Sequence, residues 1–249
     1  MADAVRIALV YPAALGTYGD GGNAVVLAKR LRWRDLDAEL VPVEIDQPLP
    51  SQADIYVLGG GEDSAQSLAV SRLADGTLAR AAERGATVFA VCAGFQILGE
   101  TWLDGHGKQT PGLGLIDCRT DRLDGPRAVG ELLVDAALPD VGVLTGYENH
   151  GGRTTLGSGA VPLGRTQAGT GNGAGGVDGA LQGGVVATYL HGPALARNPA
   201  LADYLLSRVV GELEPLDDTD AEELRRERIR AVTSVRPGRR QWRPPARNT

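Results

Sequence analysis

Short apolar runs alternate with segments of helical periodicity along the first hundred residues. Apolar or β-branched runs bounded by turn residues predict buried strands at 5–11, 39–45, 55–58 and 87–91. Helices are predicted between them, over 23–34 and over 64–84. Strands that alternate with helices indicate an α/β protein with a mostly parallel, doubly wound sheet. Ligands of such sheets bind beyond the carboxyl ends of the strands.

After residue 112 the pattern changes to short strands separated by glycine turns. We expect strands at 113–118, 129–134, 143–147, 161–164 and 184–190, as an antiparallel extension of the same domain. Helices are expected at 199–212 and 219–232. The chain therefore divides into one domain at 1–213, a C-terminal helix at 214–235 and a disordered basic tail at 236–249, where Pro and Arg dominate.

Composition narrows the class of protein. A net charge of −6 argues against a general nucleic-acid binder, so we expect no nucleic-acid partner. Two cysteines in 249 residues give no disulfide framework, which favours a reducing compartment. We find neither a signal-peptide pattern nor an apolar run of membrane-spanning length, and we expect a cytoplasmic protein without a transmembrane segment.

The most informative segment surrounds Cys92. The apolar strand at 87–91 stops at this cysteine, and Ala93 and Gly94 then open a helix. This order predicts a strand, a sharp turn and a helix with a nucleophile at the corner. The helix N-terminus would favour the thiolate over the thiol. The alternative is a buried core cysteine, but a strand that simply continued would not need small residues after it.

Three histidines compete for the role of general base. His191 follows the strand at 184–190 and should emerge at the same sheet edge as Cys92, where its imidazole could activate the sulfur. His150 also ends a predicted strand and is the competitor. His106 lies between two glycines and is interpreted as an exposed turn residue.

A glycine loop, Gly59-Gly60-Gly61, follows the strand at 55–58 and opens a helix. Its spacing matches neither a dinucleotide fingerprint nor a P-loop, so any ATP-driven step would come from another chain. An oxyanion hole fits the loop better, with the N–H groups of Gly60 and Ala93 as donors. Cys118 is expected in the core, and the cysteines and histidines do not have zinc spacing, so no metal site is predicted.

Taken together, these residues resemble class I, triad-type glutamine amidotransferases. Cys92-Ala-Gly-Phe-Gln96, the glycine loop and the late strand before His191 carry the resemblance. The chain is more similar still to the branch shared by cobyric-acid synthases and GatD-type glutaminase subunits of lipid II isoglutaminyl synthases. The similar segments there are 11–23, 59–66, 146–154 and 189–199.

The resemblance implies a flavodoxin-like sandwich fold and a glutaminase. Cys92 would attack the side-chain amide of L-glutamine, and His191 would protonate the departing ammonia. Gln96, Gly59 and Gly61 would help to place glutamine, and Arg127 matches an arginine that binds its α-carboxylate. The chain itself would need no cofactor.

The implied partner is a Mur-ligase-like synthetase subunit in a heterodimer. That partner would hold ATP and Mg²⁺ and use the ammonia to amidate the D-glutamate α-carboxylate of lipid II, near the inner face of the membrane. Alternatives are an amidotransferase subunit for cobyric-acid synthesis and a non-catalytic regulatory homologue.

One departure concerns the third triad residue. Classical members carry His-x-Glu, whereas this chain has His191-Gly192-Pro193, and proline cannot accept the imidazole proton. Either Cys92 and His191 act as a dyad or an acidic residue comes from elsewhere. In GatD-type enzymes an aspartate of the partner is thought to fill this place, and we predict the same here, with weak glutaminase activity for the isolated chain.

Overall fold

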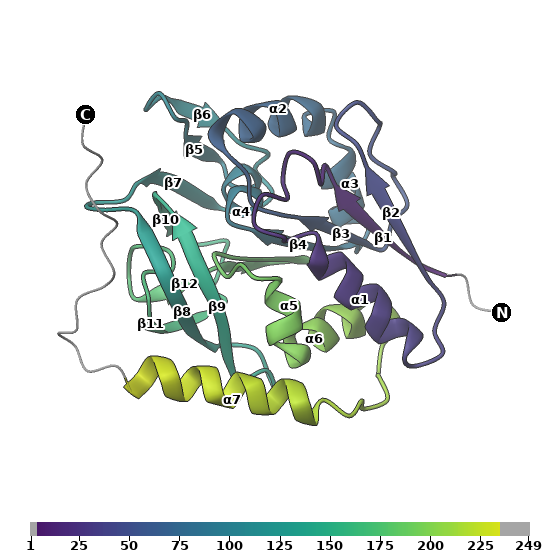
Figure 1. The fold of residues 1–249 in the computed structure, drawn as a ribbon. Coiled ribbons are helices and arrows are strands. Elements are labelled where there is room, and N and C mark those ends of the chain that lie inside the picture. Colours follow the sequence, from purple (N-terminus) through teal and green to yellow (C-terminus); the bar gives the residue numbers. More distant parts are fainter. Residues whose placement is uncertain (1–3, 235–249) are drawn as a thin grey trace, which may run out of the picture.

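A six-stranded sheet in the order β13-β14-β4-β3-β1-β2 forms the centre of the molecule (Figure 1). The computed structural model describes residues 4–234. Neighbouring strands run parallel from β14 to β2, and β13 is the antiparallel edge strand. The strands are β1 (Val5–Val10), β2 (Ala38–Val43), β3 (Ile55–Leu58), β4 (Thr87–Val91), β13 (Ala180–Gln182) and β14 (Val185–Thr188). This confirms the predicted mostly parallel α/β sheet.

Helices cover both faces of this sheet, as a parallel sheet requires. Every residue of β3, β4 and β14 is buried, which explains their continuous apolar or small-residue runs. In Figure 1 one face carries α1 (Gly22–Arg32), α5 (Ala194–Arg197) and α6 (Pro199–Val210). The other face carries α2 (Asp63–Leu73), α3 (Thr77–Glu83) and α4 (Ala93–Leu98).

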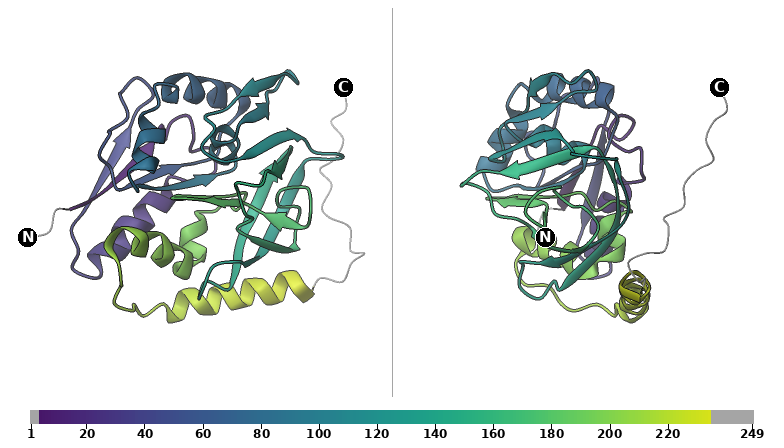
Figure 2. Two further views of the ribbon diagram at one scale, coloured as in Figure 1. Left: turned by 180° about the vertical axis from the view of Figure 1, so that it is seen from behind. Right: turned by 90° about the vertical axis from the view of Figure 1, so that its left-hand side faces the viewer.

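Two four-stranded sheets lie beyond the carboxyl ends of the central strands (Figures 1 and 2). One has the order β10-β7-β5-β6 and the other β12-β11-β8-β9. The antiparallel half is therefore two sheets and not a single extension. Their strands are β5 (Thr101–Leu103), β6 (Gln109–Pro111), β7 (Cys118–Arg122), β8 (Ala128–Ala136), β9 (Val143–His150), β10 (Gly152–Leu156), β11 (Gly164–Ala168) and β12 (Val177–Asp178).

Three predicted elements are wrong in detail. The helix expected at 64–84 is divided into α2 and α3, because Gly76 adopts a left-handed conformation (φ 77°) at the start of α3. The strand expected at 113–118 begins only at Cys118, since the residues before it bond back to the end of α4. The strand expected at 161–164 begins at Gly164, and Val161 forms only an isolated bridge to Leu181.

The C-terminal helix α7 (Thr219–Ser234) begins at the residue predicted for the helix at 219–232, after a non-helical stretch at 214–218, and runs along the outside of β9 and α5 (Figure 1). Arg30 of α1 fixes the segment that leads to it. The Arg30 side chain is 3% exposed and bonds the carboxylates of Asp203 and Asp218, each at 2.7 Å. Within residues 4–234 we find no helix with the length and apolar character needed to cross a membrane. The predicted disordered tail lies outside the described residues.

Candidate active site

Cys92 stands at the corner between β4 and α4, as predicted. Its backbone has φ 52° and ψ −104°, a conformation that non-glycine residues rarely adopt. This sharp turn is that of a nucleophile elbow. Gly94 allows the turn to pack, because a Cβ atom there would lie 2.9 Å from Cβ of Leu58. The Cys92 side chain therefore lines a cavity at the sheet edge, although the residue is only 6% exposed.

His191 is buried and oriented by Asp20. The imidazole Nδ1 lies 2.9 Å from Oδ2 and 3.2 Å from Oδ1 of Asp20, so Nδ1–H donates to the carboxylate. The backbone of His191 bonds Tyr147 of β9, which holds it beyond the end of β14. The His191 Nε2 atom is buried and has no hydrogen-bond partner among residues 4–234. It is therefore free to exchange a proton in the site.

Gly60 lies close to both Cys92 and His191. A Cβ atom on this residue would lie 2.6 Å from Cε1 of His191 and 3.5 Å from Cβ of Cys92. A side chain at this position would therefore collide with the His191 ring, so only glycine fits beside it. The N–H of Gly60 donates to Oδ2 of Asp20 at 2.8 Å. The prediction that this N–H serves the oxyanion hole is therefore wrong, because the aspartate already occupies it.

Two other backbone N–H groups belong to this region, those of Ala93 and Gly61. The Ala93 N–H bonds Cys92 and lowers the pKa of its thiol. Gly61 lines the same cavity, and its N–H makes no hydrogen bond within the described part of the chain. Gly59, predicted to contact substrate, instead packs against Leu15 and Asp20, and its carbonyl accepts the Gly94 N–H at 3.1 Å.

Burial dominates the electrostatics of Cys92. Burial, followed by the negative charge of Asp20, raises the pKa of the thiol to about 12, while the Arg127 guanidinium and the Ala93 N–H lower it. The helix N-terminus was expected to favour the thiolate, but in the chain without a partner burial outweighs that effect and the thiol stays protonated. A buried thiol of this kind needs a base to take its proton as it reacts.

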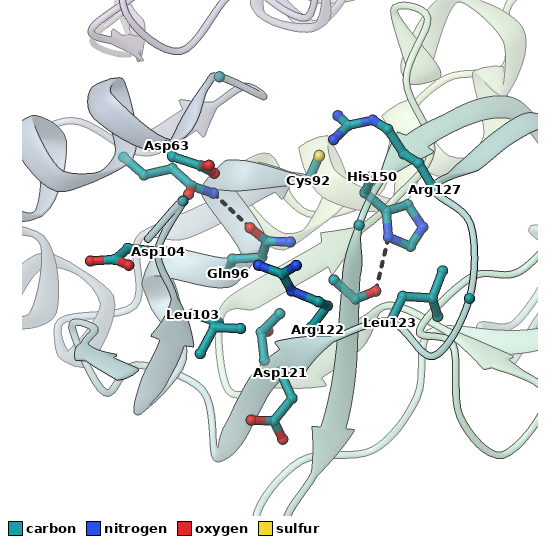
Figure 3. A pocket seen from close by; sticks show the side chains of 17 residues that line it. Asp63, Cys92, Gln96, Leu103, Asp104, Asp121, Arg122, Leu123, Arg127 and His150 are labelled. Atoms are coloured by element: carbon teal, nitrogen blue, oxygen red, sulfur yellow. Dashed lines mark hydrogen bonds between the residues drawn. The ribbon is translucent and has the colours of Figure 1, made fainter. Parts of the chain in front are cut away.

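Arg127 lines the cavity and is held by Asn149. Its Nε donates to Asn149 Oδ1 at 2.5 Å, and one terminal nitrogen donates to the Asn149 carbonyl at 2.9 Å. The Asn149 amide in turn donates to the Tyr18 hydroxyl at 3.1 Å. The Tyr18 ring packs 4.6 Å from that of His191. The Asn149 side chain therefore links Arg127 to Tyr18, which packs on His191. Figure 3 shows Arg127 beside Cys92.

Gln96 lies in the same cavity, one turn of α4 beyond Cys92 (Figure 3). Its Oε1 accepts from Gln66 at 2.6 Å, and its Nε2 donates to the Tyr189 hydroxyl at 3.2 Å. The cavity has a volume of about 310 Å³, enough for a small amino acid. Cys92, Gln96, Arg127 and Gly61 all line it, as the predictions for these residues require.

The other two histidines and the second cysteine lie in places that give them no evident part in activating Cys92. His150 also lines the cavity, but both of its ring nitrogens are engaged, Nδ1 with the Gly152 carbonyl at 3.0 Å and Nε2 with Glu148 at 3.4 Å, whereas Nε2 of His191 is not. His106 is exposed in a turn, and Cys118 is 1% exposed in the core, as predicted. Within residues 4–234 no group of three or more His, Cys, Asp and Glu residues could hold a metal ion.

Sequence analysis missed Asp20 and Gln66. Asp20 stands in the Tyr18–Asn23 segment that carries part of the family resemblance, which was its only signal. The third triad residue was predicted to come from the partner, whereas in the structure Asp20 of the same chain lies beside His191. The Asp20 loop can reach this position because Gly22 packs directly against the ring of Pro193.

Comparison with known proteins identifies the family. Residues 6–199 match the CobB/CobQ-like glutamine amidotransferase domain. The chain belongs to this family. It is thus a glutamine amidotransferase, with a class I amidotransferase fold.

Similar curated proteins include the same enzyme subunit from two bacteria. The chain is 32% identical over 198 residues to the GatD subunit of the glutamine-hydrolysing lipid II isoglutaminyl synthase of Staphylococcus aureus, covering 78% of this chain and 79% of that one. It is 32% identical over 209 residues to the GatD subunit of Streptococcus pneumoniae, covering 82% and 79%. The cobyric acid synthase of Methylobacterium nodulans is 34% identical over 181 residues, covering 67% of this chain but 36% of that enzyme.

Solved structures agree on the fold. A glutamine amidotransferase crystal structure superposes with a TM-score of 0.56 at 20% identity, covering 82% of this chain and 98% of that one. A glutamine amidotransferase from Thermotoga maritima gives a TM-score of 0.52 at 14% identity, covering 94% and 100%.

Proposed function

We propose that this chain is the glutaminase subunit of a lipid II isoglutaminyl synthase. The observation that carries the proposal is the extent of the match. The two GatD subunits align over about four-fifths of both chains, whereas the cobyric acid synthase aligns over 36% of its own length. The active-site geometry supports the glutaminase step.

The reaction would begin with the buried thiol of Cys92. His191 Nε2 takes the proton as the sulfur attacks the side-chain amide carbon of L-glutamine. The N–H groups of Ala93 and Gly61 stabilise the oxygen of the tetrahedral intermediate. The C–N bond then breaks, the leaving nitrogen receives its proton from His191, and ammonia departs from a glutamyl thioester. His191 next takes a proton from water, which hydrolyses the thioester to glutamate.

Asp20 would act as a positioning residue in this cycle. Its carboxylate fixes the His191 tautomer with the proton on Nδ1, which leaves Nε2 as the base. When Nε2 gains a proton, the neighbouring carboxylate stabilises the imidazolium. The Gly60 N–H orients the carboxylate in turn. The chain would thus carry its own triad of Cys92, His191 and Asp20.

Glutamine would be recognised by its α-carboxylate and by the amide-lined wall of the cavity. Arg127 is a planar cation on this wall and can form paired hydrogen bonds with a carboxylate. Its charge also lowers the pKa of the Cys92 thiol, so carboxylate recognition and activation of sulfur would depend on one side chain. Gln96, which also lines the cavity, would help to place glutamine.

The ammonia would serve a Mur-ligase-like synthetase subunit bound as a heterodimer. That partner, with ATP and Mg²⁺, would activate the D-glutamate α-carboxylate of lipid II, and ammonia would convert it to D-isoglutamine. The chain would work in the cytoplasm, close to the inner face of the membrane through this lipid-linked acceptor.

Two measurements test the proposal. Treatment with a diazo-oxo-norleucine probe should label Cys92, and a Cys92→Ser variant should lose labelling and glutaminase activity. The chain should also co-purify with the synthetase and support glutamine- and ATP-dependent amidation of lipid II. Glutaminase activity without amidation of lipid II, but with amidation of a corrinoid acid, would assign the chain to the cobyric-acid branch.

A further inference from the structure

A cavity-lining residue carries a buried amide oxygen that has no hydrogen-bond partner among residues 4–234. Gln66 of α2 lines the cavity and is 3% exposed. Its Nε2 donates to Gln96 Oε1 at 2.6 Å, the bond whose dashed line ends on Gln96 in Figure 3. Its Oε1 is buried and accepts no hydrogen bond from residues 4–234. Such an acceptor costs stability unless a ligand supplies a donor.

The neighbouring groups hold this oxygen in one orientation. Gln96 uses its oxygen to accept from Gln66 and its nitrogen to donate to the Tyr189 hydroxyl. The Tyr189 hydroxyl also bonds Thr154 at 2.7 Å inside the protein. Since both polar atoms of Gln96 are engaged, the free acceptor of the amide pair is Gln66 Oε1. The site therefore holds a neutral acceptor on α2, next to Gln96, which lies one helical turn beyond the nucleophile.

L-glutamine carries one group that matches this acceptor. Its reacting amide must lie at Cys92, and its α-carboxylate pairs with Arg127. The α-ammonium group remains, and it is a strong donor. Asp63, Asp104 and Asp121 also line the cavity, but Asp63 is exposed, Asp104 already accepts the His106 and Lys108 N–H groups, and Asp121 accepts from Gln109.

We propose that Gln66 is a specificity residue, whose Oε1 accepts a hydrogen bond from the α-ammonium group of L-glutamine. This inference rests on the proposed glutaminase function. A neutral amide suits the position because the negative charge of Asp20 already raises the pKa of the Cys92 thiol. A second carboxylate near the sulfur would make the thiol still harder to ionise.

Two substrates and two variants test the assignment. We would measure ammonia release from L-glutamine and from 4-carbamoylbutanoate, which is glutamine without its α-amino group, using the chain in complex with its synthetase partner. The wild-type protein should prefer L-glutamine in kcat/KM by about 10- to 100-fold, as expected for a hydrogen bond to a charged group. In Gln66→Met the preference should fall to within about threefold, because only glutamine loses a contact.

Asp63→Asn is the matched control, because Asp63 belongs to the same cavity and its carboxylate is the competing acceptor. This variant should keep the wild-type preference. A Gln66→Met protein that slows both substrates equally would show a structural role and overturn the proposal. So would loss of the preference in Asp63→Asn. Absence of ammonia release from L-glutamine by the wild-type complex would instead refute the proposed glutaminase function.

Discussion

The Asp20 carboxylate lies 2.9 Å from Nδ1 of His191, although the two residues are 171 positions apart in the chain. Both side chains are fully buried, and the Gly60 N–H holds the carboxylate at 2.8 Å. A chain that lacks the His-x-Glu pattern therefore still has an acidic group at the histidine. This contact leads to the first prediction.

Asp20→Asn should lower the glutaminase kcat by about 100-fold or more, because the amide would favour the wrong histidine tautomer. The carboxamide has the shape of the carboxylate and can still accept the Gly60 N–H, so the fold should remain. The assay is ammonia release by the complex with its partner. Full activity of this variant would indicate that a partner residue, and not Asp20, orients His191.

The Cys92 thiol should react as a buried, protonated group in the isolated chain. Because its pKa is raised to about 12, iodoacetamide alkylation at Cys92 should keep rising from about pH 7 to pH 10 without a plateau. Peptide mass spectrometry distinguishes Cys92 from Cys118. A plateau below about pH 8 would contradict the assignment.

Alkylation of Cys92 by iodoacetamide should change in opposite directions when a nearby negative or positive charge is removed. Asp20→Asn should speed alkylation of Cys92, because the Asp20 charge raises the thiol pKa. Arg127→Gln should slow it, because the guanidinium lowers that pKa. Faster alkylation together with slower turnover in Asp20→Asn would separate an electrostatic effect from loss of folding.

Asn149→Ala should weaken glutamine binding more than it slows chemistry. The variant removes the hydrogen bond from Arg127 Nε to the Asn149 side-chain oxygen and keeps the bond to the Asn149 backbone carbonyl. The less firmly held guanidinium should raise KM for glutamine by about 10-fold with a smaller change in kcat. Tyr18→Phe removes only the hydroxyl that Asn149 contacts and should have less effect. A fall in kcat without a change in KM would argue against this positioning role.

Asp178 should make stability depend on pH. Burial raises the pKa of this carboxyl from 3.8 to about 6, despite hydrogen bonds from Thr188 and Tyr189. The folded state holds the proton more tightly than the unfolded state, so this group's contribution to stability falls as pH rises from about 4 to about 6. It then stays low at neutral pH.

Asp178→Asn removes that titration. Relative to wild type, the variant should therefore gain stability between about pH 4.5 and pH 7, measured by urea unfolding at both values. The Thr188 hydroxyl can accept as well as donate, so the amide keeps its partners. An equal difference between the two proteins at both pH values would show that Asp178 ionises normally.

Local sequence was sufficient for the elements that carry the nucleophile. The apolar run at 87–91 and the small residues after Cys92 predicted the strand, the turn and the helix, and all three are present. The strand before His191 and the glycine loop were found in the same way. The predictions failed where contacts with distant segments decide the structure, as at residues 113–116, whose N–H groups bond to the end of α4 and to Gly99 and not to a strand.

The sequence by itself determined which residues could react, because hydrophobic periodicity and small turn residues act over a few positions along the chain. Only the tertiary structure decided which distant groups contact these reactive residues. Packing of Gly22 on Pro193 brings Asp20 to His191, the Asp20 carboxylate occupies the Gly60 N–H, and burial keeps Cys92 protonated. These are contacts and desolvation between distant segments, and no local pattern encodes them.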